Sequence, residues 1–369
     1  MRAIAAFLLW MAISFGAAAE EYSAQGDKTP FPTEAWAEVA PDDRLRAALG
    51  AVLARAFEGT RPPALSNTKA MVVIVGGRLA AERYAVGITK DTRLQSWSMA
   101  KSFLHAALGL AIGDGLIDPD APAAVPEWQS PGDPRAKITP RELGQMTDGL
   151  AFREDYADTN SEVMQMLFGA GRGDVGASAA AARPLHAPGT VWSYSGGSAN
   201  ILSRVLRDRL GGREAYRAFL HERLFKPIGM MSAVAEFDAA GTWIASSYVH
   251  ATARDFAKFG LLYLNRGFWE MRQLIPRDWV EGAAKPSAAS KGFYGTLFWL
   301  NGRDPSTGRF AISEKLPEDI YFARGFGGQL IAIAPSHDAV IVMLSAAYSE
   351  DNQPIVDLFA DLLSVIERR

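Results

Sequence analysis

Residues 98–112 read Ser-Met-Ala-Lys-Ser-Phe-Leu-His-Ala-Ala-Leu-Gly-Leu-Ala-Ile. The run is almost wholly apolar after Lys101, which predicts a buried helix that begins at Ser98. Residues three apart on a helix share a face, so the Lys101 Nζ can reach the Ser98 Oγ. A serine at a helix start also has a free backbone N–H, directed at any oxyanion that forms there. The stretch therefore predicts a serine nucleophile with a lysine as its proton acceptor.

The Ser-x-x-Lys pattern is weak by itself, because it occurs twice. Ser66-Asn67-Thr68-Lys69 also matches, but it follows Pro62-Pro63 in a loop that enters a predicted strand. A lysine base must be neutral, which an apolar helix and a nearby cation or tyrosine favour. Only Ser98 and Lys101 have such surroundings. Taken alone, the motif is more typical of an N-cap serine with a solvated lysine.

Two glycine-rich segments add further candidates. Tyr194 lies in the turn Ser193-Tyr194-Ser195-Gly196-Gly197, before a helical pattern, where a phenol can face a cleft. The segment Arg324-Gly325-Phe326-Gly327-Gly328-Gln329 leads into a predicted strand. Its glycines would let a ligand approach the edge backbone, and a free N–H there could complete an oxyanion hole. The simpler interpretations are a packed tyrosine and a β-bulge.

Ser98-x-x-Lys101, Tyr194-Ser195-Gly196 and Phe326-Gly327-Gly328-Gln329, in this order, resemble the serine hydrolases of the penicillin-recognising superfamily. The resemblance is to the class C β-lactamase-like branch, which includes esterases and 6-aminohexanoate-dimer hydrolases, and it covers residues 36–366. Supporting stretches are 138–150, Pro188-Gly189-Thr190, 251–255 and 294–299.

The resemblance implies a role for each matching residue. Ser98 would be acylated, Lys101 would take its proton, and Tyr194 would hand that proton to the leaving group. The backbone N–H groups of Ser98 and Gln329 would form the oxyanion hole. The implied substrate contacts are Tyr156, Phe326, Gly327 and Gly328, of which Tyr156 falls where the nylon-oligomer branch has a substrate-contacting tyrosine.

The sequence departs from the family pattern at two places. Gly196 stands where Tyr-x-Asn or Tyr-x-Ser has a polar side chain, and Phe326-Gly327-Gly328 stands where the family has Lys-Thr-Gly or His-x-Gly. No cation is then in line for a substrate carboxylate, unless Arg324 turns in. Both changes favour esters or uncharged amides over β-lactams and peptides.

Strand patterns near both ends of the chain enclose a long helical stretch. The expected strands cover 70–75, 79–84, 295–300, 329–334 and 339–344, and a last helix covers about 354–366. We expect an α+β, β-lactamase-like fold, with an antiparallel sheet from both chain ends flanked by helices and an inserted, mostly helical domain. The expected parts are a signal peptide at 1–19, a linker at 20–35, a sheet domain at 36–92 and 292–369, and a helical domain at 93–291.

The N-terminus sets the expected compartment. Arg2, an apolar run over 3–15 and the small residues 17–19 form a signal-peptide pattern, too short for a membrane anchor of about 20 apolar residues. We expect export, to the periplasm or the medium, without stable membrane insertion once the signal is removed.

The composition excludes several classes of protein. Lys and Arg number 38 against 41 Asp and Glu, which does not suit a nucleic-acid binder. The chain has no Cys, and its five His show no ligand spacing, so we expect no metal and no cofactor. The sequence thus predicts an exported serine hydrolase of a small ester or amide. The alternatives are a β-lactamase or D-Ala-D-Ala peptidase, and a non-catalytic envelope binding protein of the same fold.

Overall fold

The computed structural model describes residues 30–37 and 43–368. The predicted signal peptide at 1–19 lies outside these residues, as does most of the predicted linker at 20–35.

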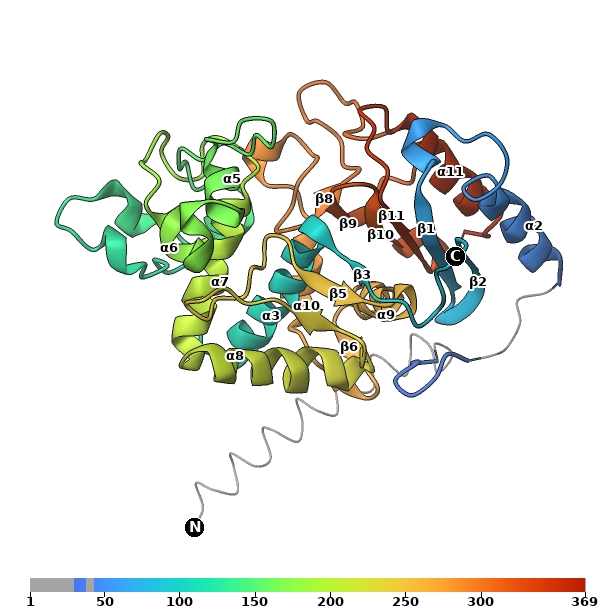
Figure 1. The fold of residues 1–369 in the computed structure, drawn as a ribbon, viewed down its shortest axis with the longest axis horizontal. Coiled ribbons are helices and arrows are strands. Elements are labelled where there is room, and N and C mark those ends of the chain that lie inside the picture. Colours follow the sequence, from blue (N-terminus) through green and yellow to red (C-terminus); the bar gives the residue numbers. More distant parts are fainter. Residues whose placement is uncertain (1–29, 38–42, 369) are drawn as a thin grey trace, which may run out of the picture.

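A six-stranded antiparallel sheet draws its strands from both ends of the chain (Figure 1). Its strand order is β2-β1-β11-β10-β9-β8. The strands are β1 (Thr68–Val75), β2 (Arg78–Tyr84), β8 (Trp299–Leu300), β9 (Tyr321–Gly325), β10 (Gln329–Ala334) and β11 (Ala339–Ser345). The expected antiparallel sheet from both chain ends is therefore confirmed.

The turn between β1 and β2 follows from its two glycines. Gly76 and Gly77 have φ angles of 58° and 71°, in the left-handed region that glycine tolerates best. Val75 and Arg78 pair directly across this two-residue turn. Two successive residues at positive φ match the twist of a hairpin, so the local sequence determines this connection.

Helices cover both faces of the sheet (Figure 1). On one face lie α2 (Asp43–Ala54) and α11 (Gln353–Ser364), which contact each other. On the other face α9 (Ala253–Leu264) packs on β1, β10 and β11. The hydrophobic core between the sheet and the pair α2 and α11 includes Leu53, Met71, Val73, Leu330, Ile341, Leu358 and Phe359. The core on the α9 face includes Val72, Ile74, Phe103, Phe256, Ile331, Val340 and Val342.

The chain between β2 and β8 is mostly helical. Its remaining α-helices are α3 (Ala100–Gly113), α4 (Pro140–Gly144), α5 (Glu162–Leu167), α6 (Val175–Ala180), α7 (Gly196–Leu210), α8 (Arg213–Phe219) and α10 (Arg277–Ala283). A π-helical turn, η6 (Leu220–Phe225), extends α8. Short strands form two small sheets: β3 (Leu94–Gln95), β5 (Val249–Ala251) and β4 (Val234–Ala235), and β6 (Phe268–Trp269) with β7 (Arg272–Gln273).

The expected strand over 295–300 is largely wrong. Only Trp299 and Leu300 are extended, because Leu297 has a φ of 57° and its amide bonds to the carbonyl of Gly144 at 2.9 Å. The chain turns there before it can pair. Strand β9 was not expected, and it is the strand that borders Ser98.

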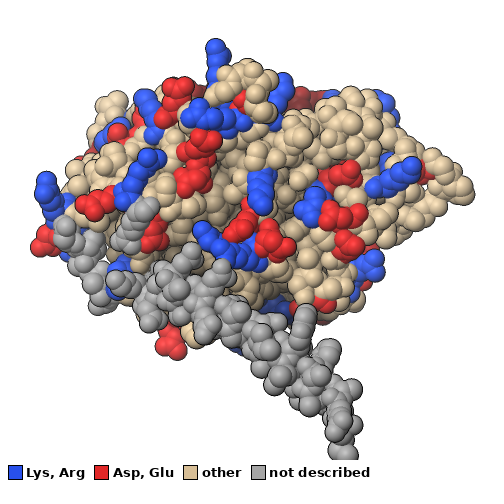
Figure 2. Space-filling model, turned by 180° about the vertical axis from the view of Figure 1, so that it is seen from behind, with Lys and Arg blue, Asp and Glu red and all other residues tan. Residues whose placement is uncertain are grey.

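The helix lengths and the surface charge are relevant to the predicted absence of membrane insertion and of nucleic-acid binding. None of the helices in the described ranges is long and apolar enough to cross a membrane. On the face opposite to that of Figure 1, acidic and basic side chains are intermixed (Figure 2). The absence of nucleic-acid and membrane partners stays a prediction.

Helix α9 packs closely on the sheet at Gly260, and this contact can be tested. A Cβ on Gly260 would lie 2.4 Å from Val340 Cγ1 and 2.9 Å from Ile331 Cγ2. Gly260→Val should lower the free energy of unfolding by about 2 kcal/mol through overpacking. Gly282 of α10 has no atom within 4 Å of such a Cβ, so Gly282→Val is the matched control. Urea unfolding that leaves both variants equally stable would contradict this packing.

Candidate active site

Ser98 lies in a strained turn at the start of a buried helix. The 3-10 turn η2 (Trp97–Met99) leads directly into α3, whose residues 100–111 are all buried. Trp97 has a φ of 45°, which is uncommon for a residue other than glycine and is typical of functional turns. The turn leaves Ser98 half-buried and in the wall of a cavity.

Lys101 is directed back at this serine from one helical turn deeper. Its Nζ lies 3.0 Å from the Ser98 Oγ and donates to the Ser246 carbonyl at 2.9 Å. Its side chain is only 2% exposed, and among the described residues it has no carboxylate partner. The predicted nucleophile and proton acceptor are therefore in contact, so a proton can pass between them without an intervening group.

The aromatic ring of Tyr194 lies next to the Lys101 amine. The Lys101 Nζ lies 4.8 Å from the centroid of the Tyr194 ring, which in turn packs on Trp299 at 5.2 Å and on Tyr294 at 6.1 Å. Tyr194 immediately precedes α7, whose N-cap is Ser195. The structure thus brings the three predicted catalytic residues together.

Asn200 holds the carbonyl that Lys101 contacts, and sequence reasoning missed it. The Asn200 Nδ2 donates to Ser246 Oγ at 3.1 Å, and its Oδ1 accepts from the Ser246 amide at 3.0 Å. Asn200 is fully buried on α7. Asn200 is one of several polar residues in the helical stretch 196–210, so no local pattern set it apart or revealed its partner.

A buried carboxyl supports the start of α7. Asp148 accepts a hydrogen bond from Ser198 Oγ at 2.6 Å and one from the Leu150 amide at 2.9 Å. Burial raises the pKa of Asp148 to about 6, although both hydrogen bonds act to lower it. Asp148 thereby fixes the start of the helix that carries Asn200 and that follows Tyr194.

Glu154 occupies the place that the missing side chain of Gly196 leaves. Its Oε2 accepts from the Gly196 amide at 2.7 Å, and its Oε1 accepts from the Tyr156 hydroxyl at 2.9 Å. A Cβ on Gly196 would lie 3.2 Å from both carboxylate oxygens. The polar group absent from the turn is thus supplied by a residue 42 positions earlier, which no motif in the sequence indicated.

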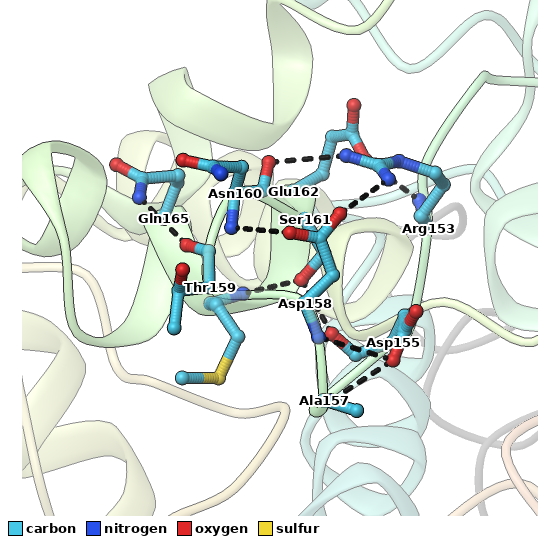
Figure 3. A network of polar contacts seen from close by, with 10 residues as sticks. Arg153, Asp155, Ala157, Asp158, Thr159, Asn160, Ser161, Glu162 and Gln165 are labelled. Carbon is cyan, nitrogen blue, oxygen red and sulfur yellow. Dashed lines mark hydrogen bonds and ion pairs between the residues drawn. The ribbon is translucent and has the colours of Figure 1, made fainter.

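The loop that carries Glu154 and Tyr156 is fixed by its own polar contacts (Figure 3). Arg153 binds Asp158 at 2.7 Å and Glu162 at 2.8 Å, and the Ser161 hydroxyl donates to the Asp155 carbonyl at 2.5 Å. This network holds the loop against α5. Tyr156 is exposed at the mouth of the cavity, where the sequence predicted a substrate contact.

Strand β9 presents a free backbone edge next to the serine. Backbone N–H and C=O groups point to alternate edges along a strand. The carbonyl of Ile320, the residue before β9, accepts from the Asn301 amide after β8 at 3.2 Å. Phe322 and Arg324, two and four residues later, therefore direct their backbone groups to the same edge, towards β8. Strand β8 reaches only to Trp299, which pairs with Phe322. The amide of Phe326 therefore lies on the same edge, beyond the end of β8.

This register corrects the predicted second oxyanion donor. A Cβ on Gly325 would lie 3.1 Å from the Ser98 nitrogen, so the end of β9 is what borders the serine. Gln329 pairs with Gly325 on the opposite edge of β9, and its side chain bonds to the Ser345 backbone. Gln329 begins β10 on the far edge of β9, so we infer from the alternation along β9 that the Phe326 amide, directly after Gly325, is the one that faces Ser98.

The segment beside Ser98 is consequently Ala323-Arg324-Gly325, and Phe326-Gly327-Gly328 forms the turn that follows it. Arg324 does line the cavity, so the expectation that no cation serves the site needs revision. Its guanidinium lies 5.6 Å from the Trp299 ring, and burial lowers the pKa of Arg324. Among the described residues, no carboxylate forms an ion pair with it.

The cavity has a volume of about 410 Å³, within the range of small-molecule sites. Its wall includes the predicted residues Ser98, Tyr156, Tyr194, Phe326, Gly327 and Gly328, together with Glu154 and Arg324. Lys101 and Gln329 lie behind the wall. No group of three or more His, Cys, Asp or Glu side chains in the described residues could hold a metal ion.

Comparison with known proteins gives a consistent result. A family model described as Beta-lactamase matches residues 66–363. The 6-aminohexanoate-dimer hydrolase of Paenarthrobacter ureafaciens is 26% identical over 324 residues, which cover 82% of this chain and 78% of that protein.

Solved structures share the fold. The D-stereospecific amidohydrolase of a Streptomyces species has a TM-score of 0.58 at 20% identity, covering 86% of this chain and 98% of that one. The D-alanine carboxypeptidase AmpC of Burkholderia cenocepacia has a TM-score of 0.59 at 18% identity, covering 88% and 100%.

The buried Asp148 makes the stability of this site depend on pH. Its carboxyl has a pKa of about 6 in the folded protein against an ordinary pKa of 3.8, so folding tightens its hold on the proton. Its contribution to stability is therefore greatest below pH 3.8 and is lost as the pH rises through about 6.

Between about pH 4 and 7, wild type should lose about 2 kcal/mol of unfolding free energy relative to Asp148→Asn. Urea unfolding of both proteins at several pH values tests this. Parallel pH profiles would show that Asp148 does not titrate in this range.

Proposed function

The chain belongs to the beta-lactamase family of serine hydrolases, and on this basis we propose that it cleaves a small ester or amide through an acyl-enzyme on Ser98. The observation that carries the proposal is the 3.0 Å contact between the Ser98 Oγ and the Nζ of a buried lysine without a carboxylate partner among the described residues. A solvated lysine beside an N-cap serine, the simpler interpretation of the motif, would not be enclosed in this way.

The proposed reaction has two halves. Lys101 accepts the hydroxyl proton while Ser98 attacks the carbonyl carbon, and the amides of Ser98 and Phe326 stabilise the oxyanion. The oxyanion then collapses, the bond to the alcohol or amine breaks, and the proton passes through Tyr194 to that leaving group. Water adds to the acyl-enzyme and releases the acid, which restores Ser98.

Arg324 favours a second candidate function. A guanidinium in the cavity wall without an ion-pair partner among the described residues can bind a substrate carboxylate, which β-lactams and peptide termini carry. This supports the alternative of a β-lactamase or D-Ala-D-Ala peptidase. Ala323, which stands in the segment beside Ser98 where the family pattern has lysine or histidine, still favours the ester or amide.

We further propose that the protein is exported to the periplasm or the medium. The support is the pattern at 1–19, which lies outside the residues that the structure describes.

Replacement of the nucleophile tests the main proposal. Ser98→Ala should reduce p-nitrophenyl acetate hydrolysis to the buffer rate, because the acyl-enzyme cannot form. The second Ser-x-x-Lys copy offers a matched control, since Ser66 lies outside the cavity wall and Ser66→Ala should keep wild-type turnover. Persistent turnover by Ser98→Ala would refute the proposal, and a silent wild type would favour a non-catalytic binding protein.

Tyr194→Phe tests the proton relay. The variant keeps the ring against Lys101 but loses the hydroxyl, so kcat should fall about 10²–10⁴-fold. The fall should be smaller for p-nitrophenolate, which needs no proton to leave, than for an alkoxide from ethyl acetate. Equal losses for both esters would argue against transfer to the leaving group.

Intact-mass measurement after incubation with a penicillin separates the two candidate functions. The ester or amide proposal predicts no stable penicilloyl adduct and no nitrocefin turnover. Accumulation of an adduct on Ser98, or rapid nitrocefin hydrolysis, would favour the second candidate.

A further inference from the structure

The cavity that begins at Ser98 extends well past the site of the proposed reaction. It runs along the uncovered edge of β9 to the space between the sheet and α11. We call this second part the chamber; its wall includes Leu316, Phe322, Leu330, Ile355, Val356 and Phe359. Most of these side chains belong to the core on the α11 side of the sheet.

The chamber differs chemically from the Ser98 end. Among the described residues, the cavity wall has two charged side chains, Glu154 and Arg324. Glu154 accepts from the Gly196 amide at the Ser98 end. Arg324 pairs with Leu330 across β9 and β10, and its guanidinium extends to the Trp299 ring against which Tyr194 packs, so it lies where the two parts of the cavity meet.

The six chamber residues named above are aliphatic or aromatic, and the polar residues Ser349 and Asn352 line the cavity just before α11. Contact with those six side chains favours an apolar, uncharged part of a ligand.

The mouth of the cavity is also apolar. Tyr156, Phe326 and Tyr348 are 45%, 51% and 69% exposed. The Phe326 ring centroid lies 6.4 Å from that of Tyr156 and 5.7 Å from that of Tyr348. It also lies 5.9 Å from that of Trp97, at an angle of 76° between the rings. Exposed aromatic side chains gathered around one opening favour an apolar ligand that covers them.

The position of the chamber relative to Tyr194 indicates which side of the scissile bond it receives. Tyr194, the proposed proton donor to the leaving group, packs on Trp299 at 5.2 Å. Trp299 pairs with Phe322, and both line the cavity where it passes into the chamber. The chamber thus opens on the leaving-group side of Ser98.

We propose that the substrate is an ester or amide of a long-chain alcohol or amine, whose hydrocarbon chain lies in the chamber between β9, β10 and α11. This inference rests on the proposed serine hydrolase function. It adds that the leaving group, rather than the acyl group, carries the apolar chain that determines specificity.

The expected gain follows from the burial of methylene groups. Each buried CH₂ contributes about 0.8 kcal/mol, which corresponds to about a fourfold change in kcat/KM. Primary alcohols beyond ethanol differ little in leaving-group reactivity, so chain length changes binding and leaves the chemistry the same. The gain should end when the chain fills the chamber.

Alkyl acetates from ethyl to octyl, followed by titration of the acetic acid released, test the inference. The value of kcat/KM should rise at least tenfold from ethyl to hexyl acetate. A p-nitrophenyl series from acetate to octanoate varies the acyl chain instead and should rise less. A flat alkyl series, or a steeper acyl series, would overturn the inference.

Two substitutions on α11 provide a matched pair. Val356→Trp fills the chamber and should lower the hexyl-to-ethyl ratio at least fivefold. Ser364→Trp places the same side chain on the exposed end of the helix, outside the cavity wall, and should keep the wild-type ratio. Equal ratios in a folded Val356→Trp and in wild type would place the chain elsewhere.

A measurement on the wild type does not depend on any variant folding. Straight-chain alcohols, the products of the proposed reaction, should inhibit p-nitrophenyl acetate hydrolysis more strongly as they lengthen from butanol to octanol. If p-nitrophenyl acetate is cleaved through Ser98 while the alcohols show no such trend, the chamber inference fails and the proposed function stands. If no ester is cleaved and Ser98 cannot be labelled, both fail.

Discussion

The contact between Ser98 and the buried Lys101 is the interaction on which this site depends. A lysine amine costs free energy when it leaves water, and here it gains two oxygen acceptors in exchange but, among the described residues, no carboxylate. The fold maintains that contact from three directions: α3 supplies the serine and the lysine one turn apart, Asn200 fixes the Ser246 carbonyl, and Tyr194 covers the amine. Helices α3 and α7 both contribute buried side chains to the hydrophobic core on the α9 face of the sheet, and Tyr194 packs against the same core.

The sheet contributes the other side of the site. Gly325 lets β9 pack against the backbone that leads to Ser98, because a Cβ at this position would lie 2.3 Å from the Ser96 carbonyl oxygen. Strand β8 ends at Trp299, which leaves the edge of β9 beyond Phe322 unpaired. Glu154 takes the space left at Gly196, so the site keeps a polar group there in a different form. The same early end of β8 opens the route from Ser98 to the chamber below α11.

Local patterns in the sequence allowed much of the fold to be predicted. Strand β10 has the expected bounds, β11 differs from its expected range by one residue, and Ser98 and Lys101 meet as helical spacing requires. The errors concern contacts between distant parts of the chain. The sequence around Gly325 does not reveal that it borders Ser98, so the second amide was assigned to Gln329 rather than Phe326. Glu154 was missed for the same reason, because its contact with Gly196 depends on tertiary packing.

The most direct test of the central claim is the rate at which a fluorophosphonate labels the protein, with the modified peptide identified by mass spectrometry. We expect one adduct, on Ser98, formed at least 10²-fold more slowly in Lys101→Met than in wild type. Labelling at another serine, or an unchanged rate without the Lys101 amine, would contradict it.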